Sequence, residues 1–254
     1  MQPVVQRLNE LLARLEASFA RERSFTADVA HELRTPLAGL TTALQVCASQ
    51  PRAPEDYQRV MAQCLKVSNS MRLMVENLLT LARADARQLR PVSQPIHLET
   101  LLKDTWSEYA PRAAAKHLEI SWSLAPETSL STDPGLLTVV LRNLFDNALT
   151  YANDAGSVHV ETRSDAHGLA LRISNTGSLV DVQDAPKVFD RFWRSDAART
   201  PSGDHCGLGL ALCQRIALLL GGTIDATTIT SGLFTITLRF PPTQSPPPQA
   251  TSSQ

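Results

Sequence analysis

Residues 25–37 have the sequence FTADVAHELRTPL, and this stretch decides what the first part of the chain can form. Its apolar side chains recur every four residues, as on one face of an α-helix, at Phe25, Val29, Leu33 and Leu37. His31 lies about 200° round the helix from Val29, so we expect it to point to solvent. An exposed imidazole is largely neutral at pH 7 and can act as a nucleophile, and Glu32 is close enough to orient the ring or take up a proton.

The sequence around this stretch predicts two long helices joined by a turn. One runs from about residue 24 to 49 and contains Pro36, which predicts a kink because one main-chain hydrogen bond is lost. The turn signal QPRAP follows at 50–54, and a second helix runs from about 55 to 85. The stripe of the second helix is sustained for nearly four heptads, at Tyr57, Met61, Cys64, Val67, Met71, Val75, Leu78 and Ala82.

Two long helices joined by a short turn form an antiparallel hairpin with one apolar face exposed, so we expect two copies to build a four-helix bundle. Upstream of the hairpin, residues 4–22 carry a heptad stripe at Leu8, Leu11 and Leu15, with Ser18 and Glu22 in the next two positions. This segment is either a linker helix that pairs with a partner or one helix of an ordinary bundle.

After Pro91 the pattern changes to α+β, without a regular βαβ alternation. Strand-like runs cover residues 118–122, 158–162, 169–174 and 233–240, and helical runs cover about 99–115, 135–151 and 208–220. We therefore predict a linker helix at 1–23, a helical hairpin at 24–90 and a two-layer α+β sandwich at 91–241. The tail at 242–254, rich in Pro, Ser, Thr and Gln, is predicted to be disordered.

Composition narrows the function classes. The 254 residues contain 24 Lys and Arg against 25 Asp and Glu, a net charge of −1 that offers no global case for binding nucleic acid. The four cysteines form no C-x-x-C pair, so we interpret them as reduced thiols. No apolar run of ~18 residues and no signal peptide is present, and we expect this chain to be soluble.

Residues 25–37 resemble the H-box of sensor histidine kinases, whose pattern is roughly F-x-x-x-x-x-H-E-x-R-T-P-L. The resemblance implies that His31 is autophosphorylated and that Glu32 is the adjacent acid or base. Thr35 matches a position that some members use to orient water when they dephosphorylate their partner. Arg34 is either part of that phosphate site or a solvated helix charge.

Residues 141–151, LRNLFDNALTY, place Asn143 and Asn147 four residues apart on one helix face, where both amide oxygens can converge on one ligand. Neutral oxygens suit Mg²⁺ that already carries triphosphate oxygens, although such asparagines also often bond to local backbone. The segment resembles the N-box of the same family, which makes both asparagines Mg²⁺–ATP ligands and lets Tyr151 line the nucleotide. The family usually has a basic residue where Thr150 stands, so one phosphate contact is expected to be missing.

Residues 173–179, ISNTGSL, resemble the G1 box, usually D-x-G-x-G, although N-x-G by itself is equally a turn signal. Asn175 stands where an Asp accepts the adenine amino proton, Gly177 keeps the first glycine, and Leu179 replaces the second. An Asn oxygen still accepts this bond but forfeits ~1 kcal/mol of charge assistance. We therefore expect ATP binding to persist, weakened by up to roughly tenfold.

Residues 188–194 resemble the F-box, whose aromatic side chains equally suit packing, and Arg194 matches a position that can reach the γ-phosphate. Residues 203–210, GDHCGLGL, resemble the G2 box, in which glycines at a helix start let N–H groups approach phosphates. Gly207, Leu208 and Gly209 keep the pattern, whereas His205 and Cys206 depart from it. Residues 195–206 are expected to form a lid over ATP.

Together these segments resemble the cytoplasmic portion of a sensor histidine kinase, with an ATP-binding domain of the histidine kinase/Hsp90-like type. The resemblance implies ATP and Mg²⁺ as cofactors, a homodimer, and a response-regulator receiver domain that accepts the phosphoryl group on an aspartate. It also implies membrane and sensor segments upstream, on a receptor whose cytoplasmic side faces this portion in the bacterial inner membrane. Phosphatase activity toward the regulator and a population shift between domain arrangements are further expectations.

Two other functions are open at this point. The altered residues in the nucleotide motifs are compatible with a degenerate kinase that only scaffolds a regulator. A nucleotide fold of this type also occurs in ATP-driven conformational clamps acting on protein or DNA, but those families give no reason for HELRTP on a dimer helix.

Overall fold

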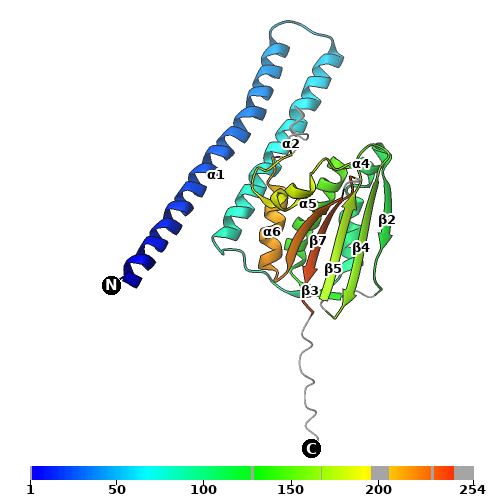
Figure 1. Cartoon of the computed structure of the whole chain (residues 1–254). Coiled ribbons are helices and arrows are strands. Elements are labelled where there is room, and N and C mark those ends of the chain that lie inside the picture. Colours follow the sequence, from blue (N-terminus) through cyan, green and yellow to red (C-terminus); the bar gives the residue numbers. More distant parts are fainter. Residues whose placement is uncertain (1, 127–128, 167, 196–205, 230–231, 243–254) are drawn as a thin grey trace, which may run out of the picture. The chain divides into compact units, whose positions relative to one another are not determined.

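The computed structural model describes residues 2–126, 129–166, 168–195, 206–229 and 232–242. Its fold matches the expected class, because a helical hairpin is followed by an α+β sandwich (Figure 1). The chain divides into two compact units, one of residues 1–76 with 200–206 and one of residues 77–199 with 207–254.

Helices α1 (Gln2–Ala48) and α2 (Pro54–Asp85) run antiparallel as a hairpin (Figure 1). The two segments expected at 4–22 and 24–49 are one continuous helix, with Pro36 inside it. The turn is closed by Arg52, whose Nε and Nη2 donate to the Val46 carbonyl at 3.3 and 3.1 Å. Arg52 thus satisfies a carbonyl that the end of α1 leaves without a helical partner.

The apolar face of α1 differs from the prediction at one end. Phe25, Val29 and Leu33 are half-buried, but Leu37 is 55% exposed in the single chain. A strict four-residue spacing advances 40° per step, so the face has turned by about 120° between Phe25 and Leu37. The half-buried stripe instead continues through Pro36 and Leu40.

The stripe of α2 shows the same drift. Five of its eight predicted members are half-buried, whereas Met61, Val75 and Ala82 are exposed. The half-buried and buried positions alternate in steps of three and four, at Tyr57, Val60, Cys64, Val67, Met71, Met74, Leu78 and Leu81. The hairpin therefore carries further apolar side chains outward, among them Leu44 and Leu65.

The second unit has a five-stranded sheet in the order β2-β4-β5-β7-β6. The strands are β2 (Glu119–Ser123), β4 (Ser157–Asp165), β5 (Gly168–Asn175), β6 (Thr223–Thr228) and β7 (Phe234–Phe240). Only β2 and β4 pair in parallel; the other neighbours are antiparallel. A separate antiparallel pair joins β1 (Gln94–His97) to β3 (Ser129–Thr132).

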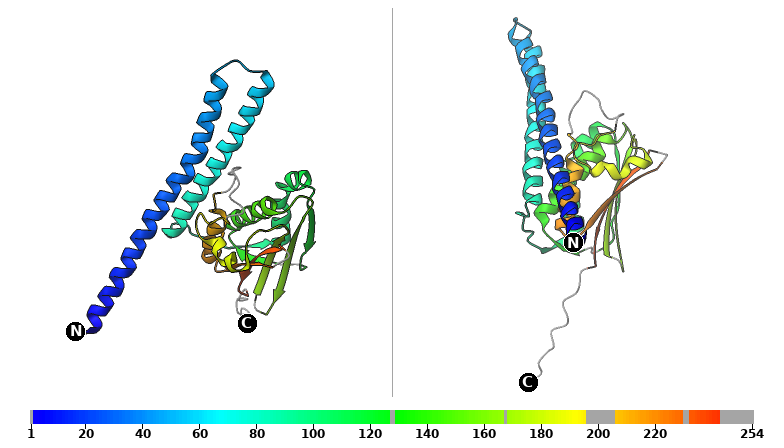
Figure 2. Two further views of the ribbon diagram at one scale, coloured as in Figure 1. Left: turned by 45° about the horizontal axis from the view of Figure 1, so that its top comes forward. Right: turned by 60° about the vertical axis from the view of Figure 1, so that its left-hand side comes forward.

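The helices of this unit form one layer and the sheet forms the other (Figures 1 and 2). The helices are α3 (Leu98–Ser107), α4 (Ala110–Ala115), α5 (Pro134–Tyr151), the 3₁₀ helix η1 (Val182–Phe189) and α6 (Gly209–Leu219). The core between the layers is mostly aliphatic, with fully buried side chains at Leu137, Leu141, Leu144, Leu171, Leu212, Ile216 and Leu238. Within the described residues, no helix is both long enough and apolar enough to span a membrane.

The single helix expected at 99–115 is two helices, α3 and α4, and that prediction was wrong. Pro111 lies in the first turn of α4, where its missing N–H costs nothing. In a continuous helix the same proline would clash with the carbonyl four residues earlier, so α3 ends at Ser107. The predicted tail lies almost entirely outside the described residues.

Asp133 begins α5, and its carboxylate accepts hydrogen bonds from the backbone N–H groups of Leu136 at 2.9 Å and Val92 at 2.8 Å. These bonds, that of Leu136 foremost, lower the pKa of Asp133. Its stabilising contribution is therefore complete above the unfolded-state pKa near ~3.9 and is lost as the pH falls through the lower folded-state value.

We expect Asp133→Ala to lower the free energy of unfolding of this unit by about 1 kcal/mol at pH 7, the usual cost of losing a helix cap. Urea unfolding at pH 7 and at pH 3 measures this, and the difference from wild type should shrink at the lower pH. Asp133→Asn is the control, because its amide oxygen still caps α5 but does not titrate. Equal stability of wild type and Asp133→Ala at pH 7 would contradict the assignment.

Candidate functional site

One face of α5 lies against the start of α6. The Asn143 side-chain Nδ2 donates to the Val139 carbonyl at 2.8 Å, so the amide is oriented and its oxygen faces α6. A Cβ built on Gly209 would lie 2.6 Å from Asn143 Oδ1. The Asn143 side chain thus makes a hydrogen bond to the local backbone, as such asparagines often do. This bond directs the side-chain oxygen at the first turn of α6.

The first turn of α6 has no side-chain cap. Its leading N–H groups and the helix dipole make a helix start of this length suitable for an anion, and Asn143 lies directly beside it. Asn147 and Tyr151 follow one and two turns further along α5, both half-buried. The two asparagine oxygens are the donor set expected for a Mg²⁺ ion that carries phosphate oxygens.

We expect Gly209→Ala to weaken ATP binding about tenfold or more, because its methyl group displaces the Asn143 oxygen. Titration calorimetry with Mg²⁺–ATP measures this. The control is Gly39→Ala, whose methyl group meets no atom within 4 Å. An unchanged affinity of Gly209→Ala for Mg²⁺–ATP would contradict the prediction that Asn143 contacts this ligand.

The end of β5 packs against the residues that follow α5. Gly177 has a φ of +86°, and a Cβ there would lie 2.4 Å from the backbone nitrogen of Asn153. Thr176 Oγ1 donates to Asn153 Oδ1 at 2.8 Å. Asn175 is only 2% exposed, and its Nδ2 donates to the Thr176 carbonyl at 3.2 Å. The Asn175 Oδ1 is the side-chain atom left to accept a hydrogen bond, so the acceptor role expected of residue 175 stays a prediction. Leu179, which replaces the second glycine, is 66% exposed.

A third glycine joins the segment 188–194 to the start of α6. Gly207 has a φ of +69°, and its carbonyl accepts the Phe192 N–H at 2.9 Å. A Cβ at Gly207 would lie 2.8 Å from the Phe192 carbonyl carbon. Leu208 is buried and Arg194 is half-buried. Of the aromatic side chains in this segment, that of Phe189 serves packing, because Phe189 is only 7% exposed.

The predicted lid lies mostly outside the described residues. Residues 196–205, His205 included, belong to this part of the chain, and only Ser195 and Cys206 of the lid are described. The four segments that resemble nucleotide motifs therefore make three contacts: Asn143 meets Gly209, Gly177 meets Asn153, and Gly207 meets Phe192.

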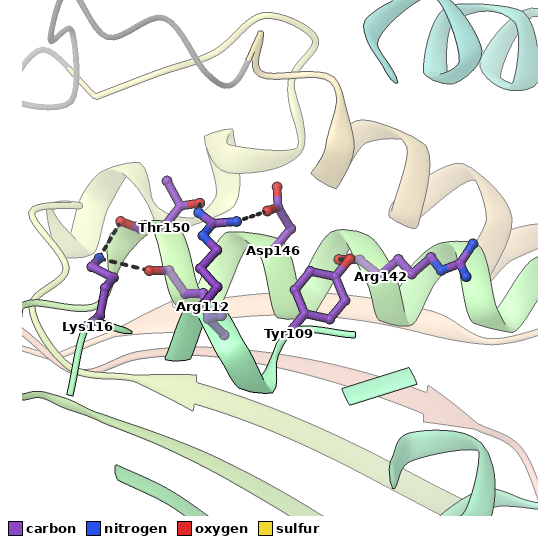
Figure 3. Close-up of polar contacts among 7 residues, drawn as sticks. Tyr109, Arg112, Lys116, Arg142, Asp146 and Thr150 are labelled. Carbon is purple, nitrogen blue, oxygen red and sulfur yellow. Dashed lines mark hydrogen bonds and ion pairs between the residues drawn. The ribbon is translucent and has the colours of Figure 1, made fainter. Parts of the chain in front are cut away.

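Sequence reasoning missed a polar cluster that α4 builds over α5 (Figure 3). Arg112 Nη1 pairs with Asp146 Oδ1 at 2.5 Å, and Arg112 Nη2 donates to Thr150 Oγ1 at 2.6 Å. Lys116 Nζ donates to the carbonyls of Leu149 and Ala152, each at 2.9 Å, and so caps the end of α5. No motif marks these partners, which lie more than thirty residues apart in sequence.

Tyr109 anchors the other end of this cluster. Its hydroxyl donates to the Arg142 carbonyl at 3.0 Å, and its ring packs on Phe145 with centroids 6.0 Å apart. Burial, with the nearby charge of Asp146, raises the pKa of Tyr109 to about 12. The hydroxyl therefore stays protonated and remains a donor throughout the physiological range.

The phosphorylation motif lies in the helical unit. His31 is exposed on α1, as predicted, and Glu32 beside it is half-buried. Thr35 is exposed, and its Oγ1 donates to the His31 carbonyl at a long 3.4 Å. Arg34 is exposed as well, which fits a solvated helix charge as readily as a phosphate contact.

Comparisons with known proteins match both units. A family model of the His Kinase A (phospho-acceptor) domain matches residues 21–87, and one of histidine kinase-, DNA gyrase B- and HSP90-like ATPases matches residues 132–244. The chain is 30% identical to sensor histidine kinase CusS of Escherichia coli K12 over 239 residues, 94% of this chain and 50% of CusS. It thus spans about half the length of the curated relatives it matches.

Two solved structures are similar. Full-length ShkA in complex with AMPPNP is 25% identical, with a TM-score of 0.62 over 84% of this chain and 44% of that chain. Histidine kinase ThkA in complex with response regulator protein TrrA has a TM-score of 0.69 over 87% of this chain and 63% of that chain. At 17% identity the second likeness shows the fold alone.

Proposed function

Since the chain belongs to the sensor histidine kinases, with a phospho-acceptor domain followed by an ATP-binding domain, we propose that it autophosphorylates on His31 and passes the phosphoryl group to an aspartate of a response regulator. The observation that carries this proposal is the meeting of Asn143 Oδ1 with Gly209 at the uncapped start of α6. It supports a triphosphate site in a chain that also presents an exposed histidine. The AMPPNP bound to the similar ShkA favours ATP as the nucleotide.

In the ATP-binding unit, Asn143 and Asn147 would hold Mg²⁺, which when bound neutralises charge on the triphosphate. Asn175 accepts the adenine amino proton, and Gly177 gives the backbone room to approach the base. Gly207, Leu208 and Gly209 present the N–H groups of the α6 start to the phosphates, while Arg194 donates to the γ-phosphate and Tyr151 lines the nucleotide.

In the transfer itself, an imidazole nitrogen of His31 attacks the γ-phosphorus in line with the bond to the β-phosphate oxygen. A P–N bond forms, the P–O bond breaks, and ADP leaves with the electron pair. Glu32 takes the proton from the other imidazole nitrogen, so the phosphorylated ring is left neutral rather than carrying a positive charge. Catalysis rests on positioning and charge stabilisation rather than on further covalent chemistry.

The phosphohistidine is high in energy, so its phosphoryl group can move to a carboxylate. A response regulator protein is also the partner in the complex of ThkA with TrrA, and ThkA is similar to this chain in fold. We also propose that Thr35 orients water when the phosphorylated regulator is hydrolysed, with Arg34 beside it. The long 3.4 Å bond from the Thr35 hydroxyl to the His31 carbonyl is weak enough to be exchanged for a water.

The hairpin is proposed to dimerise through its outward apolar side chains, which include Leu37, Leu44, Met61 and Leu65, each at least half exposed. Sensor and membrane segments are proposed to lie elsewhere in the full-length protein, with this portion on the cytoplasmic side of the bacterial inner membrane. The proposed partners do not include nucleic acid, in keeping with the net charge of −1.

The test is incubation of the chain with Mg²⁺ and γ-labelled ATP, followed by a purified receiver domain. We expect label that is labile in acid and stable in alkali, and its transfer to the receiver. Micromolar ATP binding without any label would contradict autophosphorylation in this chain. Absence of both label and ATP binding would favour a scaffold that no longer catalyses. Steady release of free phosphate by His31→Gln would instead favour an ATP-driven clamp.

A further inference from the structure

The asparagine face of α5 has no basic residue of its own. The only cation on α5 is Arg142, which lies about 100° round the helix from Asn143 and pairs with Glu108 at 2.5 Å. Asp146 and Thr150, by contrast, lie within about 60° of Asn143 and flank the proposed phosphate position. A carboxylate here would repel a triphosphate unless a cation offset it.

Arg112 brings that cation from α4. Its guanidinium bridges Asp146 and Thr150, as Figure 3 shows, with N–O distances of 2.5 and 2.6 Å. The two contacts hold the planar group across the solvent side of α5, at the level of Asn147 along the helix axis. The positive charge of Arg112 therefore lies on the face of α5 where Thr150 itself offers only a hydroxyl group.

The guanidinium can still receive an anion. Arginine has five N–H donors, and the two bonds across the fork engage one on each terminal nitrogen. The Arg112 side chain is 44% exposed, whereas Asp146 is only 22% exposed. An arriving phosphate therefore meets the guanidinium before it meets the carboxylate, and the ion pair cancels most of the repulsion.

We infer that Arg112 binds the phosphates of the nucleotide and takes the place of the basic residue that α5 lacks. Asp146 and Thr150 position the guanidinium, so the three residues act as one unit. This inference rests on the proposed nucleotide site and adds to it a residue from a different helix.

The test measures affinities of the whole chain for Mg²⁺–ATP and for adenosine by titration calorimetry. We expect Arg112→Ala to raise the Kd for ATP about 10- to 100-fold, the usual worth of a charge-assisted hydrogen bond, and to leave the Kd for adenosine unchanged. The matched control is Arg142→Ala, which removes an equally short ion pair of a similarly exposed arginine, to Glu108 between α3 and α4. It should leave both affinities as they are.

Two further variants separate phosphate binding from folding. Thr150→Lys in the Arg112→Ala background should restore ATP affinity, because it supplies a cation from α5 itself. Asp146→Asn in the same background should recover part of the loss, because it removes a negative charge from beside the proposed phosphate position. Tryptophan fluorescence confirms that each variant is folded.

The outcomes distinguish a failure of the proposed function from a failure of the inference about Arg112. A wild-type chain that binds no ATP removes the proposed function and this inference together. Normal ATP binding in Arg112→Ala removes the inference alone, as does a failure of Thr150→Lys to restore a lost affinity. An equal loss for ATP and adenosine would make Arg112 a purely structural residue.

Discussion

Replacing His31 with glutamine is expected to abolish incorporation of phosphate from ATP. The glutamine amide has similar size and polarity but no nucleophilic lone pair on nitrogen, so the attack on the γ-phosphorus has no substitute. Because His31 is exposed on α1, the free energy of unfolding should change by less than about 0.5 kcal/mol. Labelling with γ-labelled ATP at several times, beside circular dichroism, measures both quantities.

The control for this substitution is His97→Gln, which changes an exposed histidine just before α3. It should label like wild type. ATP affinity should also be unchanged in His31→Gln, because the nucleotide residues belong to the other unit. Label that persists in His31→Gln would place the phosphorylated residue elsewhere in the chain.

The second large effect concerns stability. Phe145→Ala is expected to lower the free energy of unfolding of the ATP-binding unit by about 3–5 kcal/mol. Phe145 is fully buried, and its ring packs edge-on against Trp106 with centroids 5.2 Å apart. Removing it leaves a cavity and ends an aromatic contact that contributes beyond its buried area.

Urea unfolding followed by tryptophan fluorescence measures this loss selectively. All three tryptophans, Trp106, Trp122 and Trp193, lie in the ATP-binding unit, so the signal omits the hairpin. Phe145→Leu keeps most of the volume and should cost clearly less than Phe145→Ala. A cost below about 1 kcal/mol for Phe145→Ala would show that the site collapses around the missing ring.

Periodicity predicted the central parts of this fold well. The strands at β4, β5 and β7 have buried residues at alternate positions, and α5 and α6 have long apolar faces, so each carries its own signal. The strands β1, β3 and β6 were missed because QPIH, SLST and TIDATT contain few apolar residues in alternation. Their place is decided by pairing with other strands, which a local pattern does not contain.

The candidate site divides in the same way. Residues such as Asn143, Gly177 and Gly209 were singled out because their segments resemble family motifs, in which particular residue types recur at fixed spacing. Arg112 carried no such mark, since its role depends on α4 lying beside α5. Leu37 shows the opposite error, because a plausible local spacing was extended beyond the point at which a helix with 3.6 residues per turn keeps one face.

The continuity of α1 has a consequence for rotational phase. Because no break separates Gln2 from His31, every residue between them adds a fixed 100° of turn and 1.5 Å of length. Inserting one residue in this stretch would turn His31 by about 100° against whatever is attached to the amino-terminal end, while inserting seven would restore the angle to within about 20°. A structure attached there can therefore change the direction in which His31 points by twisting the helix, as well as shift its position by pushing along the helix axis.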